Sequence, residues 1–288
     1  MILELSAIVA LIFIIVWLFG VRLLSIVDTS GRVIFHGDDD KKKQMVITID
    51  DVPWKYSIPN RLKKELKQEE DLLTTSISEI CKVLKSCGGC ATLMMIGNYT
   101  TRNLQHNKAL LEEFIEYLDE GLIQLANHGM TNSKHAKLSA EDMKVEITRC
   151  EKTVNQVLLE QLNHRRTMKN QETFQSTMQP FYRPGHGFFN KTMLDVCSEL
   201  GYRVVLGNIY PHDPFILVWW LNLLNIVIMT YVYDILKWTS FGFLASNDGQ
   251  QIVILHDRPW TAKLLSYLIP FLKWRGYDIV HLSDVIRK

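Results

Sequence analysis

The chain has 288 residues, of which 47% are hydrophobic, and this is enough for one large domain with its own core. It carries 32 lysines and arginines against 31 aspartates and glutamates, so its formal net charge is +1. This balance excludes the class of nucleic-acid-binding proteins that rely on a bulk positive charge, and we expect no nucleic-acid partner.

The first part of the chain is strongly apolar. Residues 2–27 read ILELSAIVALIFIIVWLFGVRLLSIV, and residues 5–21 contain no charged side chain. A run of this length spans the hydrocarbon core of a bilayer. No basic segment precedes it and no small-residue cleavage site is evident, so residues 1–27 are predicted to be a transmembrane anchor rather than a removed signal peptide. Residues 28–44, with the tract HGDDDKKK, are predicted to be a charged linker.

Two sequence signals disagree on the side of the membrane that holds the rest of the chain. Arg22, Arg32 and the lysines at 41–43 follow the apolar run, and the positive-inside rule then places the domain in the cytoplasm. Two glycosylation sequons, Asn98-Tyr-Thr and Asn190-Lys-Thr, instead indicate a secretory lumen or the cell exterior. We predict a single-pass membrane protein with a lumenal or extracellular domain, and a cytoplasmic domain is the alternative.

Beyond residue 44, short apolar runs alternate with amphipathic stretches. Such alternation predicts an α/β fold with a parallel sheet or barrel. The expected strands cover residues 46–50, 91–97, 122–129, 179–183, 202–207, 251–257 and 277–282, and the expected helices cover residues 61–84, 107–119 and 139–162.

The sequence MVITIDDVPW at 45–54 ends an apolar run on two adjacent carboxylates. Its four apolar or β-branched residues suit a strand that is buried on both faces. Pro53 has no backbone N–H for a ladder, so the strand must end near it. Asp50 and Asp51 then lie at the carboxyl end of the strand, and as neighbours they are expected to point in different directions. The alternative is an Asp-Asp turn that caps the next helix.

Polar side chains stand at the ends of three further predicted strands, where His128, Arg183 and the pair His256-Asp257 are found. The carboxyl ends of the strands of a parallel barrel converge on one face. The sequence therefore predicts a site there that combines metal-ligating and acid–base residues.

Six segments in order resemble the motifs of one known family. They are TIDDVP, ATLMMIGNY, ANHGMTN, YRPGHGFF, VLGNIYPHDP and IVILHD. On these segments residues 45–288 resemble a polysaccharide deacetylase of the NodB-homology type, similar to chitin deacetylases. The resemblance implies a catalytic domain with a distorted (β/α) barrel. It also implies a metal-dependent hydrolase that removes N-acetyl groups from an N-acetylglucosamine-containing, chitin-like glycan.

The resemblance also implies a metal site. Asp51, His128 and Asn132 stand at the metal-ligand positions, and a mixed oxygen and nitrogen donor set suits zinc, with cobalt or another divalent ion as the alternative. The family usually has a second histidine where this chain has Asn132, and His135 is the alternative third ligand. An amide oxygen is a weaker ligand, so the chain is alternatively a weak or inactive membrane-bound relative that binds glycans or acts as a scaffold.

The remaining site residues follow from the same comparison of motifs. Asp50 stands at the position of the general base, Arg183 at that of the residue which orients it, and His256 at that of the acid which protonates the leaving amine. The expected substrate-binding residues are Gly185, His186 and Asp213. The backbone N–H groups near Gly185 and His186 are expected to stabilise the oxyanion.

A second apolar segment, at residues 215–233, contains no charged side chain. It just meets the length of a membrane span. A true crossing would place His256 and Asp51 on opposite sides of the membrane, which one active site does not permit. We therefore predict that the segment is a helix of the barrel that docks on the membrane surface, and Asn222 and Asn225 favour this interpretation.

Overall fold

The computed structural model describes residues 20, 23–25, 27–28, 30–38, 42–57, 73–236 and 250–286. Most of the predicted anchor at 1–27 lies outside these residues. Among the helices that are described, none is both long and apolar enough to cross a bilayer.

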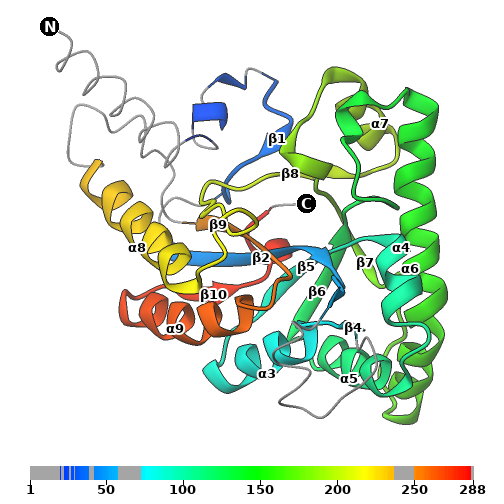
Figure 1. Ribbon diagram of the computed structural model, residues 1–288. Coiled ribbons are helices and arrows are strands. Elements are labelled where there is room, and N and C mark those ends of the chain that lie inside the picture. Colours follow the sequence, from blue (N-terminus) through cyan, green and yellow to red (C-terminus); the bar gives the residue numbers. More distant parts are fainter. Residues whose placement is uncertain are drawn as a thin grey trace, which may run out of the picture.

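The described residues form an eight-stranded sheet in which the paired strands run parallel (Figure 1). The order is β1-β8-β7-β6-β5-β2-β10, and β9 also pairs with β2. The strands are β1 Val33–Ile34, β2 Gln44–Val52, β5 Ala91–Met95, β6 Ile123–Asn127, β7 Met178–Tyr182, β8 Arg203–Val205, β9 Gln250–His256 and β10 Asp278–Val280.

The strand β2 lies at the centre of this sheet. Its residues from Met45 to Val52 are buried, as its apolar sequence predicts. The chain just after β8 returns to the sheet through a bridge between Ile209 and Val253 of β9, so the sheet curls back on itself. The predicted parallel α/β fold is confirmed.

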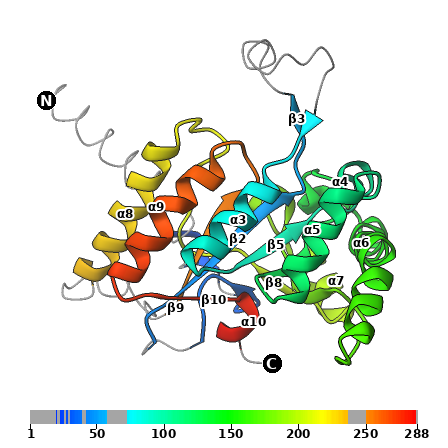
Figure 2. The ribbon, with the colours of Figure 1, turned by 90° about the horizontal axis from the view of Figure 1, so that it is seen from below.

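Helices cover the outer side of the sheet (Figures 1 and 2). The helix α6 begins after Ser139, whose hydroxyl accepts a hydrogen bond from the Asp142 amide, as the capping pattern predicts. The helix predicted at 61–84 is wrong at Leu73–Thr74, which form the strand β4 and pair with β3 Tyr56–Ser57, and the helix itself begins at Ile77. The helices are α3 Ile77–Cys87, α4 Gly97–Asn103, α5 Lys108–Asp119, α6 Ala140–Met168, α7 Lys191–Glu199, α8 Trp219–Leu236, α9 Thr261–Trp274 and α10 Leu282–Val285.

The predicted linker at 28–44 is wrong for residues 33–38, which pack against the sheet. The strand β1 pairs with β8, and Phe35 is 5% exposed among core side chains. The amides of Gly37 and Asp38 donate to the carbonyls of Gln250 and Val285, respectively. The folded domain therefore begins before residue 45, because these few residues complete one edge of the sheet.

The apolar segment at 215–233 forms most of the helix α8, which packs beside α9 (Figure 2). Trp219 stacks on Tyr267 of α9, with ring centroids 4.9 Å apart. Ile226 and Asn222 of α8 are fully buried. One face of this helix is thus part of the hydrophobic core of the domain.

Candidate active site

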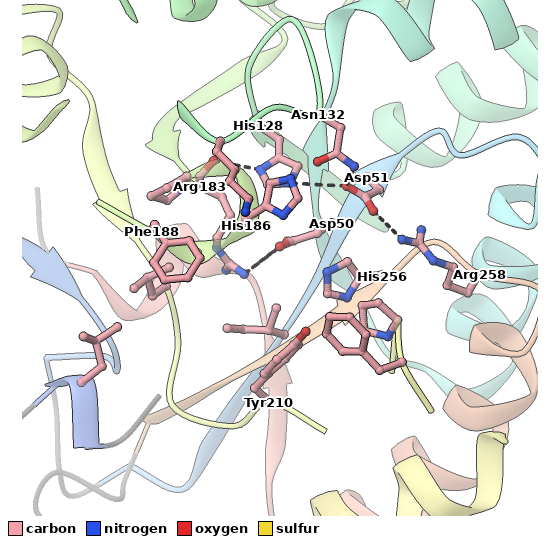
Figure 3. Close-up of a pocket in the computed structure, with 18 residues that line it drawn as sticks. Asp50, Asp51, His128, Asn132, Arg183, His186, Phe188, Tyr210, His256 and Arg258 are labelled. Atoms are coloured by element: carbon pink, nitrogen blue, oxygen red, sulfur yellow. Dashed lines mark hydrogen bonds and ion pairs between the residues drawn. The ribbon is translucent and has the colours of Figure 1, made fainter. Parts of the chain in front are cut away.

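Asp50 and Asp51 remain within β2 and line one cavity (Figure 3). The pairing of β2 with β5 shifts in register between Ile49 and Val52, and Asp51 has a left-handed φ of 64°. This bulge turns the backbone, so two neighbouring carboxylates reach the same space. Within this shared space the two carboxylates contact different groups, Arg183 for Asp50 and Arg258 for Asp51, and neither residue belongs to a helix-capping turn.

The cavity has a volume of about 560 Å³ and lies at the carboxyl ends of the strands. It brings together most of the predicted site residues from four strand ends and their loops. Asp50, Asp51, His128, Asn132, Arg183, His186 and His256 line it, whereas Gly185 and Asp213 do not.

Asp50 is held by a buried arginine. The Arg183 guanidinium is 1% exposed, and its Nη1 lies 3.2 Å from Oδ1 of Asp50. Its other nitrogens donate to Oγ1 of Thr48 at 3.0 Å and to the carbonyl of Val205 at 2.7 Å. Because every group around it is fixed by the sheet, Arg183 holds the Asp50 carboxylate in one orientation.

His128 faces the other carboxylate. Its Nδ1 donates to the Arg183 carbonyl at 2.8 Å, which leaves Nε2 as the nitrogen with the lone pair. This Nε2 lies 3.6 Å from Oδ1 of Asp51, and Nδ2 of Asn132 lies 3.0 Å from the same oxygen. The two aspartates therefore have different partners.

His256 lies beside Asp50, because the two residues pair across β9 and β2. Its Nδ1 lies 2.9 Å from Oδ1 of Asp213, and its backbone amide donates to Oδ2 at 2.7 Å. Burial lowers the pKa of His256, but the charge and hydrogen bond of Asp213 outweigh this effect and raise the pKa above its ordinary value. Asp213 was predicted to bind the substrate. It is instead 1% exposed, contacts His256 and does not line the cavity.

The sequence profile of the polysaccharide deacetylase family matches residues 37–205, which is more than half of the chain. The chain belongs to this family. It is 24% identical over 217 residues to a Bacillus cereus protein named peptidoglycan-N-acetylglucosamine deacetylase, a match that covers 74% of this chain and 83% of that relative.

Solved structures show that this member shares its fold with carbohydrate esterases of family 4. A pseudoenzyme of that family from Bacillus anthracis has a TM-score of 0.61 and 16% identity, over 91% of this chain and 72% of the other. A family 4 esterase from Streptomyces lividans, solved with acetate, has a TM-score of 0.55 and 18% identity, over 84% and 93%.

The donors around Asp51 fit a divalent ion in this family member. Two ligand atoms that each lie about 2.1 Å from a tetrahedral ion are about 3.4 Å apart. The 3.6 Å between Asp51 Oδ1 and His128 Nε2 is close to this separation. The Asn132 amide offers an oxygen when it is turned over. Within the described ranges, no group of three or more His, Cys, Asp and Glu side chains is placed to hold an ion, so a third ligand here would have to be of another type, such as this neutral amide.

The side chain of His135, the alternative third ligand, forms hydrogen bonds within the fold. It is 1% exposed, and its Nδ1 accepts from the Tyr182 hydroxyl at 2.6 Å and from the Gly185 amide at 3.0 Å. Its Nε2 lies 3.0 Å from the Thr131 carbonyl and 3.2 Å from Glu146. With both ring nitrogens engaged, His135 has no nitrogen left for an ion in the cavity.

The Gly185 amide is therefore not available to a substrate oxyanion, and its predicted role is corrected. Gly185 is required for another reason: a Cβ there would overlap with the carbonyl oxygen of Ser133. His186 does line the cavity as predicted, and it is exposed with a left-handed φ of 61°.

Arg258 and Tyr210 line the cavity and were not among the predicted residues. The Arg258 guanidinium donates to Oδ2 of Asp51 at 2.6 Å and lies 4.3 Å from the centre of the Trp54 ring. Burial would raise the pKa of Asp51, but its contact with His128 and the nearby positive groups, Arg258 among them, lower it well below the usual range. The available signal was the position of Arg258, two residues after His256 at the same strand end.

Proposed function

We propose that this chain is a metal-assisted hydrolase that removes N-acetyl groups from an N-acetylglucosamine-containing glycan. The observation that carries the proposal is that two neighbouring carboxylates in one cavity have different partners. Asp50 is bound to Arg183, and Asp51 faces His128 and Asn132. The activity named for the Bacillus cereus relative supports the choice of reaction.

Asp51, His128 and Asn132 would hold the ion, and zinc suits these donors best. When bound, a divalent ion polarises the N-acetyl carbonyl and lowers the pKa of water in the site. The tautomer required for this is already set, since the hydrogen bond to the Arg183 carbonyl directs Nε2 of His128 toward Asp51.

Asp50 takes a proton from the attacking water, and Arg183 keeps its carboxylate oriented for this step. His256 gives a proton to the nitrogen of the departing amine. Its Nδ1 is engaged by Asp213, so Nε2 carries the transferable proton. The raised pKa of His256 favours the protonated ring that this step requires.

One observation favours a second function. Arg258 places a positive charge on the carboxylate that would bind the ion, and the third ligand is an amide. The alternative function is therefore that of a catalytically weak or inactive member of the family that binds glycans. We also propose that the protein is attached to a membrane through residues 1–27 and docks through 215–233, with its domain on the lumenal or extracellular side.

The test is acetate release by the full-length protein, reconstituted in lipid nanodiscs, from N-acetylglucosamine oligomers with zinc or cobalt present. We expect turnover, and we expect the Asp50→Asn variant to bind the same amount of metal while its rate falls by about 10²–10⁴-fold. A wild-type protein that holds one ion per chain and releases no acetate from any N-acetylated glycan would show that the glycan-binding function is correct.

A further inference from the structure

The cavity has two chemically different walls. The polar groups lie around Asp50 and Asp51, and Phe188 lies at the opposite edge from Arg258 (Figure 3). The apolar part of the lining is formed by Leu24, Pro184, Phe188, Leu206, Pro214, Phe215 and Ile254. A ligand that fills this space therefore meets hydrogen-bonding groups at one end and mainly hydrocarbon at the other.

The apolar wall continues to the protein surface. Phe215 is 74% exposed and Phe188 is 62% exposed, although both line the cavity. Leu24 and Phe188 also line a second hollow of about 640 Å³, together with the exposed Val27. Large apolar side chains gathered at the mouth of a pocket mark a surface that contacts something apolar.

Beyond Phe215 this surface extends onto α8. Trp220, Leu224 and Tyr231 are exposed, and their spacing of four and seven residues places them on one face of the helix. The opposite face of α8 is in the core. Residues 215–233 contain no charged side chain, which suits contact with an apolar environment.

The chain itself indicates what this surface contacts. The uncharged run at residues 5–21 ends three residues before Leu24, which lines the cavity. A run of that length suits a bilayer core. The cavity mouth is therefore tied by a short stretch of chain to a segment that suits the membrane.

We propose that the substrate is a lipid-linked N-acetylated sugar, held with its N-acetyl group at Asp50 and Asp51 and its hydrocarbon chain along Phe188 and Phe215. The proposal rests on the function proposed above and specifies its substrate class. Aromatic side chains alone would also suit stacking on the sugar rings of a polymer. The aliphatic Leu24, Leu206 and Ile254 neither stack on rings nor bond to hydroxyls, and they favour a hydrocarbon chain.

The first experiment measures binding and does not require turnover. The full-length protein in lipid nanodiscs is exposed to a hexadecyl N-acetylglucosaminide that carries a photoreactive diazirine on its alkyl chain, and labelled peptides are mapped by mass spectrometry. We expect labels on the peptides that contain Phe188 and Phe215. An excess of unlabelled hexadecyl N-acetylglucosaminide should remove them and hexadecanol should not, whereas soluble chito-oligomers, which lack the alkyl chain, should remove them only at a much higher concentration.

Variants test whether the apolar wall is responsible. Phe188→Ser and Phe215→Ser should each lower labelling at least tenfold, because each buried methylene of an alkyl chain contributes about fourfold in affinity. Phe174→Ser is the matched control, since Phe174 is exposed in the stretch between α6 and β7 and does not line the cavity. It should leave labelling unchanged.

Two results would overturn the proposal. Equal displacement by soluble chito-oligomers would assign the cavity to a polymer. Labels confined to the Trp220 and Leu224 peptides would mean that this face docks on lipid without taking a lipid-linked substrate. Acetate release is measured in the same samples. Labelling that depends on the sugar, without acetate release from any substrate, would refute the proposed hydrolysis but would still support the binding of a lipid-linked N-acetylated sugar.

Discussion

The guanidinium of Arg258 donates a 2.6 Å hydrogen bond to Asp51, the carboxylate that also faces His128 across 3.6 Å. Stacking on Trp54 and a 2.9 Å bond from Nη1 to the Asp257 carbonyl hold Arg258 in this position. A fixed positive charge therefore occupies one oxygen of the residue that would bind the metal. An ion held by Asp51 would therefore compete with the chain's own arginine.

Arg258→Met should bind zinc or cobalt at least tenfold more tightly than the wild type, because the variant removes a like charge and frees Oδ2 of Asp51. Titration against a chelator of known affinity measures this. Arg149→Met, at an exposed position of α6, is the control and should not change the affinity. Weaker binding by Arg258→Met would mean that the arginine positions Asp51 for the ion.

Asp51→Ala and His128→Ala should each abolish stoichiometric metal binding, and Asn132→Ala should weaken it much less, since its oxygen is neutral. His135→Ala should keep the ion but lower the thermal midpoint, because its ring bonds join Tyr182 to the Thr131 loop. Bound metal per chain, determined by elemental analysis beside a thermal melt, separates these outcomes. Loss of metal from a folded His135→Ala protein would reinstate His135 as a ligand.

Metal affinity should depend on pH through His128. Burial lowers the pKa of His128, but its contact with Asp51 and the charge of Asp50 outweigh this and raise the pKa above 6.5. The ion and a proton compete for Nε2, so the affinity should fall as the pH falls through the raised pKa and level off above it. Zinc titrations over a pH series measure this, and an affinity that is constant from pH 6 to 8 would contradict it.

Arg183→Met should lower the free energy of unfolding by about 3–5 kcal/mol, because it leaves the Asp50 carboxylate buried without its partner. The double variant Asp50→Asn/Arg183→Met should recover part of this loss. Denaturant unfolding of the two single variants and the double variant completes the cycle. Strictly additive losses would show that the two side chains do not interact.

Phe35→Ala should lower the free energy of unfolding by about 3–5 kcal/mol, since Phe35 is packed in the core although it lies in the predicted linker. The exposed Phe188→Ala is the matched control and should change it by less than about 0.5 kcal/mol. The same small effect at Phe35 would return residues 28–44 to the linker.

The sequence by itself determined the strands β2 and β5 to β10 and the residues at their ends. Buried parallel strands are continuous apolar runs, and a proline or a polar residue marks where each run stops. Parallel strands end on one face, so Asp50, His128, Arg183 and His256 were expected to meet there. The structure places them around one cavity.

Only the tertiary structure decided which side chains are partners. Arg258 meets Asp51, Asp213 meets His256 and Gly185 meets His135, across separations of 207, 43 and 50 residues. Such contacts depend on how loops turn after each strand, and local sequence periods carry no information on those turns. The strand β1 was not predicted from the sequence for a related reason. Its two residues are too few to show a period, and pairing with β8 alone makes them a strand.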